Sequence, residues 1–378
     1  MDIDFTEEQE MLRTMARDFF VKECPGTLIR EIEATEEGYS KDLWAKMAEL
    51  GWMGMVIPEQ YDGIGNNYLD LVLLLEEMGR AAVPSPFFST VVLGAIPIMK
   101  AGTDDQKQEF LPKIANGDLI VAFAYTEPDP GWSPNCITVS AKADGDTYVL
   151  NGTKLFVEYA HIADYLMCVA RTKEGKNPED GLSVFLVDIK SPGIELDTYD
   201  AVNHVRQSAI TFNNVKVPAK SMLGKQDEGW PLVKSMLEHA ATAKCAEMIG
   251  GGRKVVEMAV DFVKDRIVYD RPLASFQVVQ HQCVDMRMLV DLARSVTYET
   301  AWRLSEDIPC STEVAACKAW TSDAYFHICK VGSHLHGAMG FTWDHDIGLY
   351  YRREIAARFA FGNSEHHWNI LANQLAAA

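Results

Sequence analysis

Near the middle of the chain stands the stretch Tyr148-Val149-Leu150-Asn151-Gly152-Thr153-Lys154-Leu155-Phe156-Val157. Its two apolar runs, Tyr148–Leu150 and Leu155–Val157, have the residue types that favour β-strands. Asn-Gly between them is the strongest short signal for a hairpin turn. The stretch therefore predicts two short strands joined by a turn at Asn151-Gly152.

Similar signals surround this stretch between residues 118 and 226. Val139, Ala141 and Ala143 alternate with polar residues, and Asp144-Gly145 then predicts a turn. Further strands are expected at Leu166–Ala170, Leu182–Val187 and Ile210–Val217, and further turns at Pro192-Gly193 and Asn213-Asn214. Together these signals predict a compact β domain, either a barrel or a two-sheet sandwich.

Helical periodicity flanks the β region on both sides. At the start, Thr6 and Gln9 have the spacing of a capping box. Helices are expected at Tyr68–Arg80 and Asp104–Ala115 and, after Trp230, at Met236–Lys264, Val278–Leu304 and Glu313–Leu335. We therefore expect an N-terminal helical domain (1–117), a β domain (118–226) and a C-terminal helical bundle of the four-helix type (227–378).

Charge and hydropathy exclude several classes of protein. The 378 residues include 54 Asp and Glu against 35 Lys and Arg, a formal net charge of −19. Nucleic-acid binding requires clustered cations that neutralise phosphates, so this balance argues against a nucleic-acid partner. No apolar stretch approaches the ~20 residues that cross a bilayer, and the acidic start Met1–Glu8 lacks the pattern of a signal peptide. We expect a soluble, cytoplasmic protein.

The cysteines and histidines show no pattern typical of a metal site. The 8 cysteines stand singly, without a Cys-x-x-Cys pair, which argues against structural zinc and against a redox dithiol. Cys168, Cys245 and Cys329 lie among apolar residues and are expected in the core. His366-His367 has no acid or cysteine at ligand spacing, so we expect no bound metal.

Four segments carry recognisable motifs. They are Tyr125–Gly131 (Tyr-Thr-Glu-Pro-Asp-Pro-Gly), Asn151–Val157, Arg266–His281 (Arg-Ile-Val-Tyr-Asp-Arg-Pro-Leu-Ala-Ser-Phe-Gln-Val-Val-Gln-His) and His336–Trp343 (His-Gly-Ala-Met-Gly-Phe-Thr-Trp). Each alone has an ordinary explanation, such as a turn, a core aromatic or a surface ion pair. In this order across the whole chain they resemble the acyl-CoA dehydrogenase family.

This resemblance implies a reaction and its partners. In the family, a carboxylate takes the α-proton of an acyl-CoA thioester while the β-hydrogen leaves as hydride to N5 of FAD. The thioester carbonyl is hydrogen-bonded, which stabilises the developing enolate. Electrons then pass to an electron-transferring flavoprotein. The resemblance also implies a homo-oligomer, a dimer or a tetramer, in which the C-terminal motifs reach the FAD of a neighbouring subunit.

The motif positions give a set of residues expected at FAD. The Tyr125–Gly131 loop offers backbone groups and a hydroxyl to the polar edge of the flavin, and Phe156 can cover one face. Arg266 suits a diphosphate, and Gly337 allows close backbone approach. The full set is Tyr125, Thr126, Gly131, Trp132, Phe156, Val157, Glu158, Arg266, Tyr269, Gln277, His334, Gly337, Ala338, Ser364 and His366.

The catalytic base departs from the family pattern. The usual Glu precedes a Gly-Thr near the C-terminus, and Phe361 stands there, before Gly362-Asn363. In other members the base lies on the first helix of the C-terminal domain, where Ala240 stands. Glu158 replaces a small hydroxyl residue beside flavin N5, so we consider it as a relocated acid or base. Trp132, Ser133, Glu238 and Gly362 are expected at the substrate.

Several functions remain open. The first is a dehydrogenase with a non-standard base, acting on a cyclic, branched or aromatic-derived acyl group. The second is an FAD-binding subunit that lacks its own base and works in a mixed tetramer with a base-bearing paralogue. An oxidase on the same fold and a helical interaction protein without cofactor are further alternatives, which oxygen consumption and a colourless protein would reveal.

Overall fold

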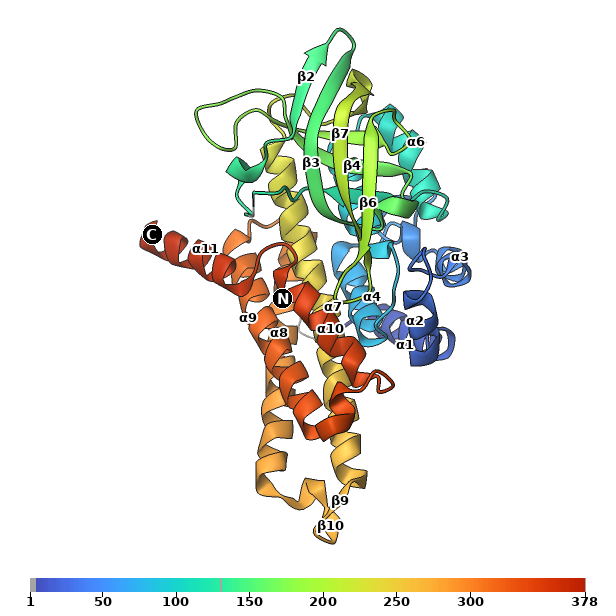
Figure 1. Cartoon of the computed structure of the whole chain (residues 1–378), viewed down its shortest axis with the longest axis vertical. Coiled ribbons are helices and arrows are strands. Elements are labelled where there is room, and N and C mark those ends of the chain that lie inside the picture. The colour runs from blue at the N-terminus through green and yellow to red at the C-terminus, as the bar shows by residue number, and fades with distance from the viewer. Residues whose placement is uncertain (1–4, 130, 378) are drawn as a thin grey trace. The chain divides into compact units, whose positions relative to one another are not determined.

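The computed structural model describes residues 5–129 and 131–377, so Pro130 of the Tyr125–Gly131 segment and Met1–Asp4 of the acidic start lie outside the described residues. The chain is helical, then β, then helical, as the sequence predicts (Figure 1). By contacts it forms two compact units. Unit 1 combines residues up to 30, 67–83 and 241 onward, and unit 2 combines 31–66 and 84–240. The division into three domains at residues 117 and 226 stays a prediction.

The β region of unit 2 is one sheet. Within the described residues its eight strands are ordered β6-β7-β3-β2-β4-β5-β8, with β1 paired to β4. β2 and β4 meet through Ser140 and Arg171, so the sheet consists of two halves joined at this pair. The strands are β1 Val121–Ala124, β2 Ser140–Asp144, β3 Thr147–Glu158, β4 Tyr165–Arg171, β5 Leu182–Asp188, β6 Ile194–Asp200, β7 Arg206–Pro218 and β8 Met222–Leu223.

The prediction of a hairpin turn at Asn151-Gly152 is wrong, because strand β3 continues through both residues. Asn151 pairs with Ser140 of β2, and its side-chain Oδ1 accepts a hydrogen bond from Asn214 N of β7 at 2.9 Å. The register between β3 and β7 shifts between Leu150 and Gly152. Asn-Gly therefore forms a β-bulge inside a long strand. The turn between β2 and β3 lies at Gly145, which has a φ of 61°.

The prediction of a turn at Asn213-Asn214 is also wrong, because a strand again continues through the two residues. Both residues lie inside β7, and Asn214 has a φ of 53° opposite the bulge in β3. Asparagine tolerates this left-handed conformation better than most residues. The strands expected at Leu166–Ala170, Leu182–Val187 and Ile210–Val217 are confirmed within β4, β5 and β7.

The helices of unit 2 reach the sheet through the π-helical segment η3 Phe88–Ala95, which packs against β1. They also include α3 Lys41–Glu49, α5 Ile96–Ala101 and α6 Asp104–Ala115, which has the expected bounds. The Thr90 hydroxyl accepts a hydrogen bond from Val121 N at 3.2 Å. A Cβ on Gly94 would lie 3.0 Å from Val121 Cβ. The small residue therefore lets η3 approach the first strand closely.

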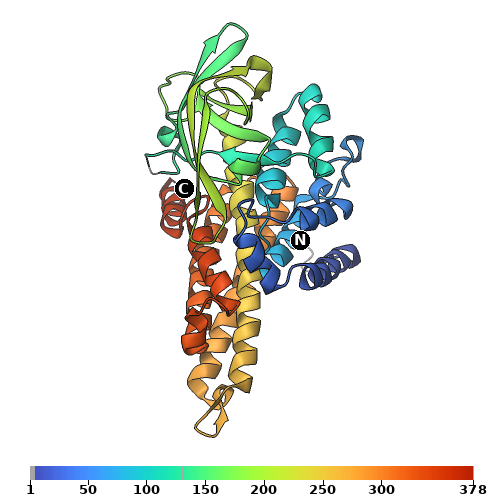
Figure 2. The same cartoon turned by 45° about the vertical axis from the view of Figure 1, so that its right-hand side comes forward.

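Unit 1 is a set of packed helices. Figures 1 and 2 show α7 to α10 side by side along much of their length. The helices are α1 Glu7–Glu23, α2 Gly26–Glu33, α4 Tyr68–Arg80, α7 Trp230–Asp265, α8 Gln277–Ser305, α9 Ser311–Leu335, α10 Ile347–Phe359 and α11 Ser364–Ala377, with the short hairpin β9 Ile267–Val268 and β10 Arg271–Pro272 between α7 and α8. The end of α2 (31–33) and the start of α7 (230–240) belong to unit 2. The expected capping box of Thr6 and Gln9 is confirmed at the start of α1.

A buried carboxylate links three helices of unit 1. Glu76 of α4 is 1% exposed and is paired with Arg253 of α7 and Arg294 of α8. Burial alone would raise the pKa of Glu76, but the two guanidinium groups outweigh it and lower the pKa. A Cβ on Gly250 would lie within 1.8 Å of Glu76 O, so glycine is required where α7 crosses α4. Glu76 therefore stays charged and holds these helices together.

Three further features of the structure concern the buried cysteines, the length of the helices and the grouping of side chains that could bind a metal. Cys168, Cys245 and Cys329 are buried, as expected. Among the described residues no helix has the length and apolar character needed to cross a membrane. In the same part of the chain, no three His, Cys, Asp or Glu side chains are grouped so as to hold a metal ion.

Candidate functional site

Two of the four motif segments are joined by a buried ion pair in unit 2. Lys154 of β3 is fully buried, and its Nζ donates to Glu127 Oε1 at 2.7 Å and to Tyr125 O at 3.0 Å. The Glu127 carboxylate also accepts from the N–H and hydroxyl of Thr138 and from Val139 N. A buried charge pair is stable only when its remaining hydrogen-bonding capacity is satisfied, and here it is. The pair fixes the Tyr125–Gly131 loop against β3.

Beside this pair, β3 presents Phe156 to solvent. Phe156 has a φ of 56° and is 57% exposed, although strands on either side are packed. The register with β7 shifts between Lys154 and Val157, and Leu155 N donates to Thr126 O at 2.8 Å. A left-handed conformation at a bulky residue is strained. The fold thus holds an exposed aromatic ring in an unfavourable conformation next to the Tyr125–Gly131 loop, which is a mark of a functional position.

Glu158 ends β3, two residues after Phe156. Its side chain is half-buried, and Gln207 of β7 is its partner in the sheet. Within the described residues, its carboxylate makes no hydrogen bond or ion pair. Val157, between Glu158 and Phe156, is fully buried and anchors this end of the strand.

Trp132 and Ser133 belong to a loop that one arginine holds in place. Arg171 at the end of β4 donates to the carbonyl oxygens of Ile137 (3.0 Å), Pro134 (2.9 Å), Pro178 (3.0 Å) and Asp180 (2.7 Å). The guanidinium therefore joins the 132–138 loop to the loop that follows β4. The Trp132 carbonyl accepts from the Tyr125 hydroxyl at 3.2 Å, which ties the loop to the first motif.

A cavity lies between these two loops. Its volume is about 400 Å³. Three cations line it, Lys142, Arg171 and Lys173, against the single acid Glu174, and Thr138, Ser140 and Thr172 add hydroxyl groups. Such a lining favours an anionic, oxygen-rich ligand. This cavity was missed by sequence reasoning, because its cations come from two segments, Lys142 in one and Arg171 and Lys173 in the other.

In unit 1, the third motif lies on the hairpin between α7 and α8. Tyr269 is 86% exposed with a φ of 51°, and Arg266 and Gln277 are also exposed. No hydrogen bond or ion pair of the Arg266 or Gln277 side chain occurs within the described residues. These side chains are therefore available to a ligand or to another subunit.

The fourth motif follows α9. His334, Gly337 and Ala338 are exposed, and Gly337 has a φ of 61°. His336 is buried instead, where it stacks on Phe262 with ring centroids 4.5 Å apart. Burial lowers the pKa of His336. The structure thus separates His336, a packing residue, from its exposed neighbours.

The turn between α10 and α11 occupies the position of the usual base. Phe361 has a φ of 57° and its carbonyl lies 2.9 Å from Nε2 of the buried His367. Gly362 O accepts from the Nζ of Lys318, a fully buried residue of α9, at 2.9 Å. Ser364 and His366, expected at FAD, begin α11 and are half-buried. The turn is rigidly held, yet it presents a phenyl ring where a carboxylate is expected.

The second possible base position also carries no acid. Ala240 of α7 is fully buried. Glu238, expected at the substrate, is half-buried, and its Oε1 lies 3.9 Å from Lys234 Nζ. Between these two residues, His239 is buried with its Nδ1 2.7 Å from Ser235 O. Neither usual location of the base therefore provides a carboxylate.

Comparison with known proteins decides the family. The family descriptions acyl-CoA dehydrogenase N-terminal, middle and C-terminal domain match residues 6–118, 122–215 and 227–376. An acyl-CoA dehydrogenase of Bacillus subtilis is 30% identical over 376 residues, which is 98% of this chain and 98% of the relative. The chain belongs to the acyl-CoA dehydrogenase family.

Further relatives of this family are similar along nearly their whole length. The caffeyl-CoA reductase-Etf complex subunit CarC of Acetobacterium woodii is 28% identical, covering 92% of this chain and 93% of that protein. The structure of butyryl-CoA dehydrogenase from Megasphaera elsdenii superposes with a TM-score of 0.92 at 27% identity, covering 99% of this chain and 100% of that one. Proteins of this family are flavoprotein oxidoreductases, and the resemblance inferred from the four motifs is confirmed.

Proposed function

We propose that this chain is an FAD-dependent dehydrogenase of acyl-CoA thioesters. The observation that carries the proposal is the Lys154–Glu127 pair, which holds the Tyr125–Gly131 loop beside the exposed ring of Phe156. A pair of charges completely removed from solvent is a costly way to fix a loop. Its position beneath a strained, exposed aromatic indicates that the loop and the ring serve one ligand with a flat, polar-edged ring system.

The described residues fit FAD. In unit 2, Tyr125, Thr126 and Phe156 provide backbone groups, a hydroxyl and an aromatic face. In unit 1, the Arg266 guanidinium has no partner among the described residues, which suits the diphosphate, and Gly337 has open space within 4 Å of where a Cβ would stand. When bound, the flavin accepts the β-hydrogen of the acyl group as a hydride.

The CoA portion of the substrate belongs in the basic cavity of unit 2. The ammonium groups of Lys142 and Lys173 match the phosphates of coenzyme A. Arg171 positions the wall of this cavity, since all its bonds go to backbone carbonyls. Trp132 and Ser133 lie on the same loop, and Gly362 and Glu238 remain the other residues proposed at the substrate.

Proton transfer falls to Glu158. It is a half-buried carboxyl two residues after the exposed Phe156, and within the described residues it forms no ion pair, so it is left available to a substrate. The acyl group is of an unusual kind, cyclic, branched or aromatic-derived, because both usual positions of the base, Phe361 and Ala240, are apolar.

The oligomer and the electron acceptor follow the family. Large apolar side chains are exposed on α8 and after α9, such as Val284 (64%), Phe341 (75%) and Trp343 (54%). Exposed apolar residues of this size are typical of protein interfaces. We expect a homodimer or homotetramer in which Arg266, Gln277, His334 and Ala338 complete the FAD site of a neighbouring subunit. An electron-transferring flavoprotein is the expected acceptor.

A second function is favoured by the apolar residues at both base positions. The chain would then bind FAD as the partner of a base-bearing paralogue in a mixed tetramer. Co-purification of a second chain of the same family would support this alternative. A Glu158 that plays no part in flavin reduction would support it as well.

Anaerobic titration of the purified protein with straight, branched and cyclic acyl-CoA thioesters tests both functions. Bleaching of the visible flavin band by one class of thioester is the expected result. Glu158→Gln should then slow bleaching by at least about tenfold, whereas Glu158→Gln that bleaches at the parent rate would remove Glu158 from the mechanism. A flavin that no thioester bleaches would favour the mixed tetramer, and a protein that takes up no FAD would overturn the proposal.

A further inference from the structure

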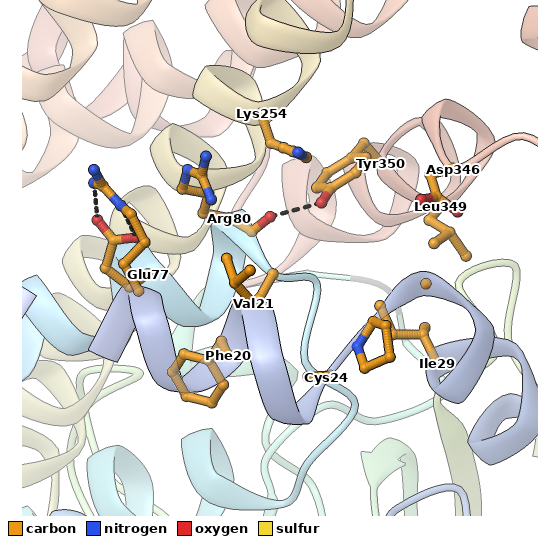
Figure 3. A pocket seen from close by; sticks show the side chains of 14 residues that line it. Phe20, Val21, Cys24, Ile29, Glu77, Arg80, Lys254, Asp346, Leu349 and Tyr350 are labelled. Atoms are coloured by element: carbon orange, nitrogen blue, oxygen red, sulfur yellow. Dashed lines mark hydrogen bonds and ion pairs between the residues drawn. The ribbon is translucent and has the colours of Figure 1, made fainter. Parts of the chain in front are cut away.

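A second cavity lies within unit 1, and no residue of the four motif segments is among those that line it. It has a volume of about 160 Å³ and is walled by the end of α1, the start of α2, the end of α4, the middle of α7 and the start of α10 (Figure 3). An apolar cavity of similar size in another protein accepts a benzene-sized ligand. This cavity is therefore large enough for a small organic molecule.

One side of the cavity is apolar. Phe20 from α1, Cys24 directly after it, Ile29 from α2 and Leu349 from α10 are each 4% exposed or less. Burial raises the pKa of the Cys24 thiol to about 11, so at neutral pH it is an uncharged, apolar group. These residues favour a hydrocarbon portion of a ligand over an inorganic ion.

The charged residues of the cavity are paired, with one exception. Arg17 is paired with Glu77, Arg80 with Glu257, and Asp346 with Arg30. Lys254 of α7 makes no hydrogen bond or ion pair within the described residues, and Figure 3 shows its side chain extending toward Tyr350. The walls therefore carry one uncompensated positive charge.

A second donor in the cavity walls is unsatisfied. Arg80 Nε is buried and has no acceptor among the described residues. Leaving a buried donor without an acceptor is unfavourable, and an oxygen from a ligand would satisfy it. The Arg80 backbone is fixed by a 2.6 Å hydrogen bond from the Tyr350 hydroxyl to Arg80 O, so its position relative to α10 is well defined.

We propose that this cavity is a binding site for a small aliphatic monocarboxylate of about four to six carbons. Its hydrocarbon portion lies against Phe20, Ile29 and Leu349, and its carboxylate accepts hydrogen bonds from Lys254 Nζ and Arg80 Nε. One negative charge balances the unpaired ammonium, whereas a phosphate dianion would exceed it. The ligand would contact five helices of unit 1, so its binding should stabilise that unit.

Calorimetric titration of the purified, flavin-loaded protein with sodium hexanoate tests this site. We expect saturable binding to one site per chain and a rise in the Tm. Hexanol, which lacks the charge, and inorganic phosphate, which lacks the chain, should bind at least about tenfold more weakly, because each loses one half of the recognition. The flavin spectrum should not change on binding.

Variants of Lys254 test whether its charge binds the carboxylate, and a variant of Lys264 serves as the control. Lys254→Met keeps the apolar stem and should weaken hexanoate binding by about tenfold or more, while Lys254→Arg should retain it. Lys264→Met removes an exposed lysine of the same helix and should bind like the parent. Equal affinity in Lys254→Met, or displacement of hexanoate by coenzyme A, would overturn the proposal, as would the absence of saturable binding. These outcomes do not depend on the flavin chemistry, so this site and the dehydrogenase function can fail separately.

Discussion

The Lys154 ammonium lies 2.7 Å from Glu127 Oε1, and both side chains are excluded from solvent. The two residues are 27 positions apart and belong to different motifs, which this contact joins. Each has further partners, since Lys154 donates to Tyr125 O and Glu127 accepts from Thr138 and Val139. The pair therefore holds the Tyr125–Gly131 segment against the Asn151–Val157 segment, although nothing in the two sequences indicates this contact.

Replacing Lys154 by Met should destabilise unit 2 and impair FAD retention. The change leaves the Glu127 carboxylate buried without its cation, which typically costs about 3–5 kcal/mol. Urea unfolding of the apoprotein and the absorbance ratio of flavin to protein would measure the two effects. A loss below about 1 kcal/mol would contradict the role of the pair.

A double variant provides the control. In Lys154→Met with Glu127→Gln, no buried charge remains, and the amide oxygen can still accept from Val139 or Thr138. The free energy of unfolding should recover in part relative to the single variant. An additive loss instead would mean that the two residues act independently.

Five helices of this chain were predictable because their periodicity is long and regular, whereas the bounds of the last two, α10 and α11, were not predicted. α6 has the expected bounds, and α8 and α9 exceed the expected Val278–Leu304 and Glu313–Leu335 by one or two residues. The edge strand β6, Ile194–Asp200, was not predicted, because an exposed strand has no buried face to impose alternation. Asn151-Gly152 was assigned to a turn because local preference cannot show that Asn214 of β7 pairs there.

Some residues of the candidate site could be predicted from the sequence and others could not. Phe156 and Tyr125–Gly131 were predictable from their motifs, whereas Arg171 and Lys318 were not. Arg171 binds backbone carbonyls, as does Lys318 at Gly362, and a carbonyl acceptor leaves no mark on the sequence. Whether Glu158 carries the proton stays a prediction, since its role depends on a ligand.

Replacing Phe156 by Gly should separate stability from function. Glycine adopts a φ of +56° without strain, so the variant should be as stable as the parent or more stable by up to about 1 kcal/mol. The exposed ring buries little apolar surface within the chain, so its loss should cost little stability. If the ring covers the flavin, FAD should dissociate at least about tenfold more readily, which fluorescence of released flavin would measure. Unchanged FAD affinity would contradict this role.

His367 should make the turn after α10 sensitive to acid. Burial lowers the pKa of His367 from 6.5 to about 4, and its Nδ1 is buried with no hydrogen-bond partner in the part of the chain that the structure describes. The unfolded chain binds the proton more readily, so the stability from neutral His367 is complete above pH 6.5 and is lost as the pH falls towards 4. Between pH 7 and 5 the parent should lose about 2 kcal/mol more than His367→Gln. Urea unfolding at both pH values would show this, and equal losses would contradict it.

Replacing Arg171 by Lys should weaken substrate binding without abolishing catalysis. One ammonium cannot satisfy four carbonyl oxygens on two loops, so the wall of the basic cavity should loosen. The KM for a reactive acyl-CoA thioester should rise about tenfold while kcat changes less than about threefold, because Arg171 touches backbone rather than the reacting atoms. Lys176→Met, in the loop after β4 but outside the cavity lining, should behave like the parent. A fall in kcat with an unchanged KM would show instead that Arg171 acts on the chemical step, and that the basic cavity is not where coenzyme A binds.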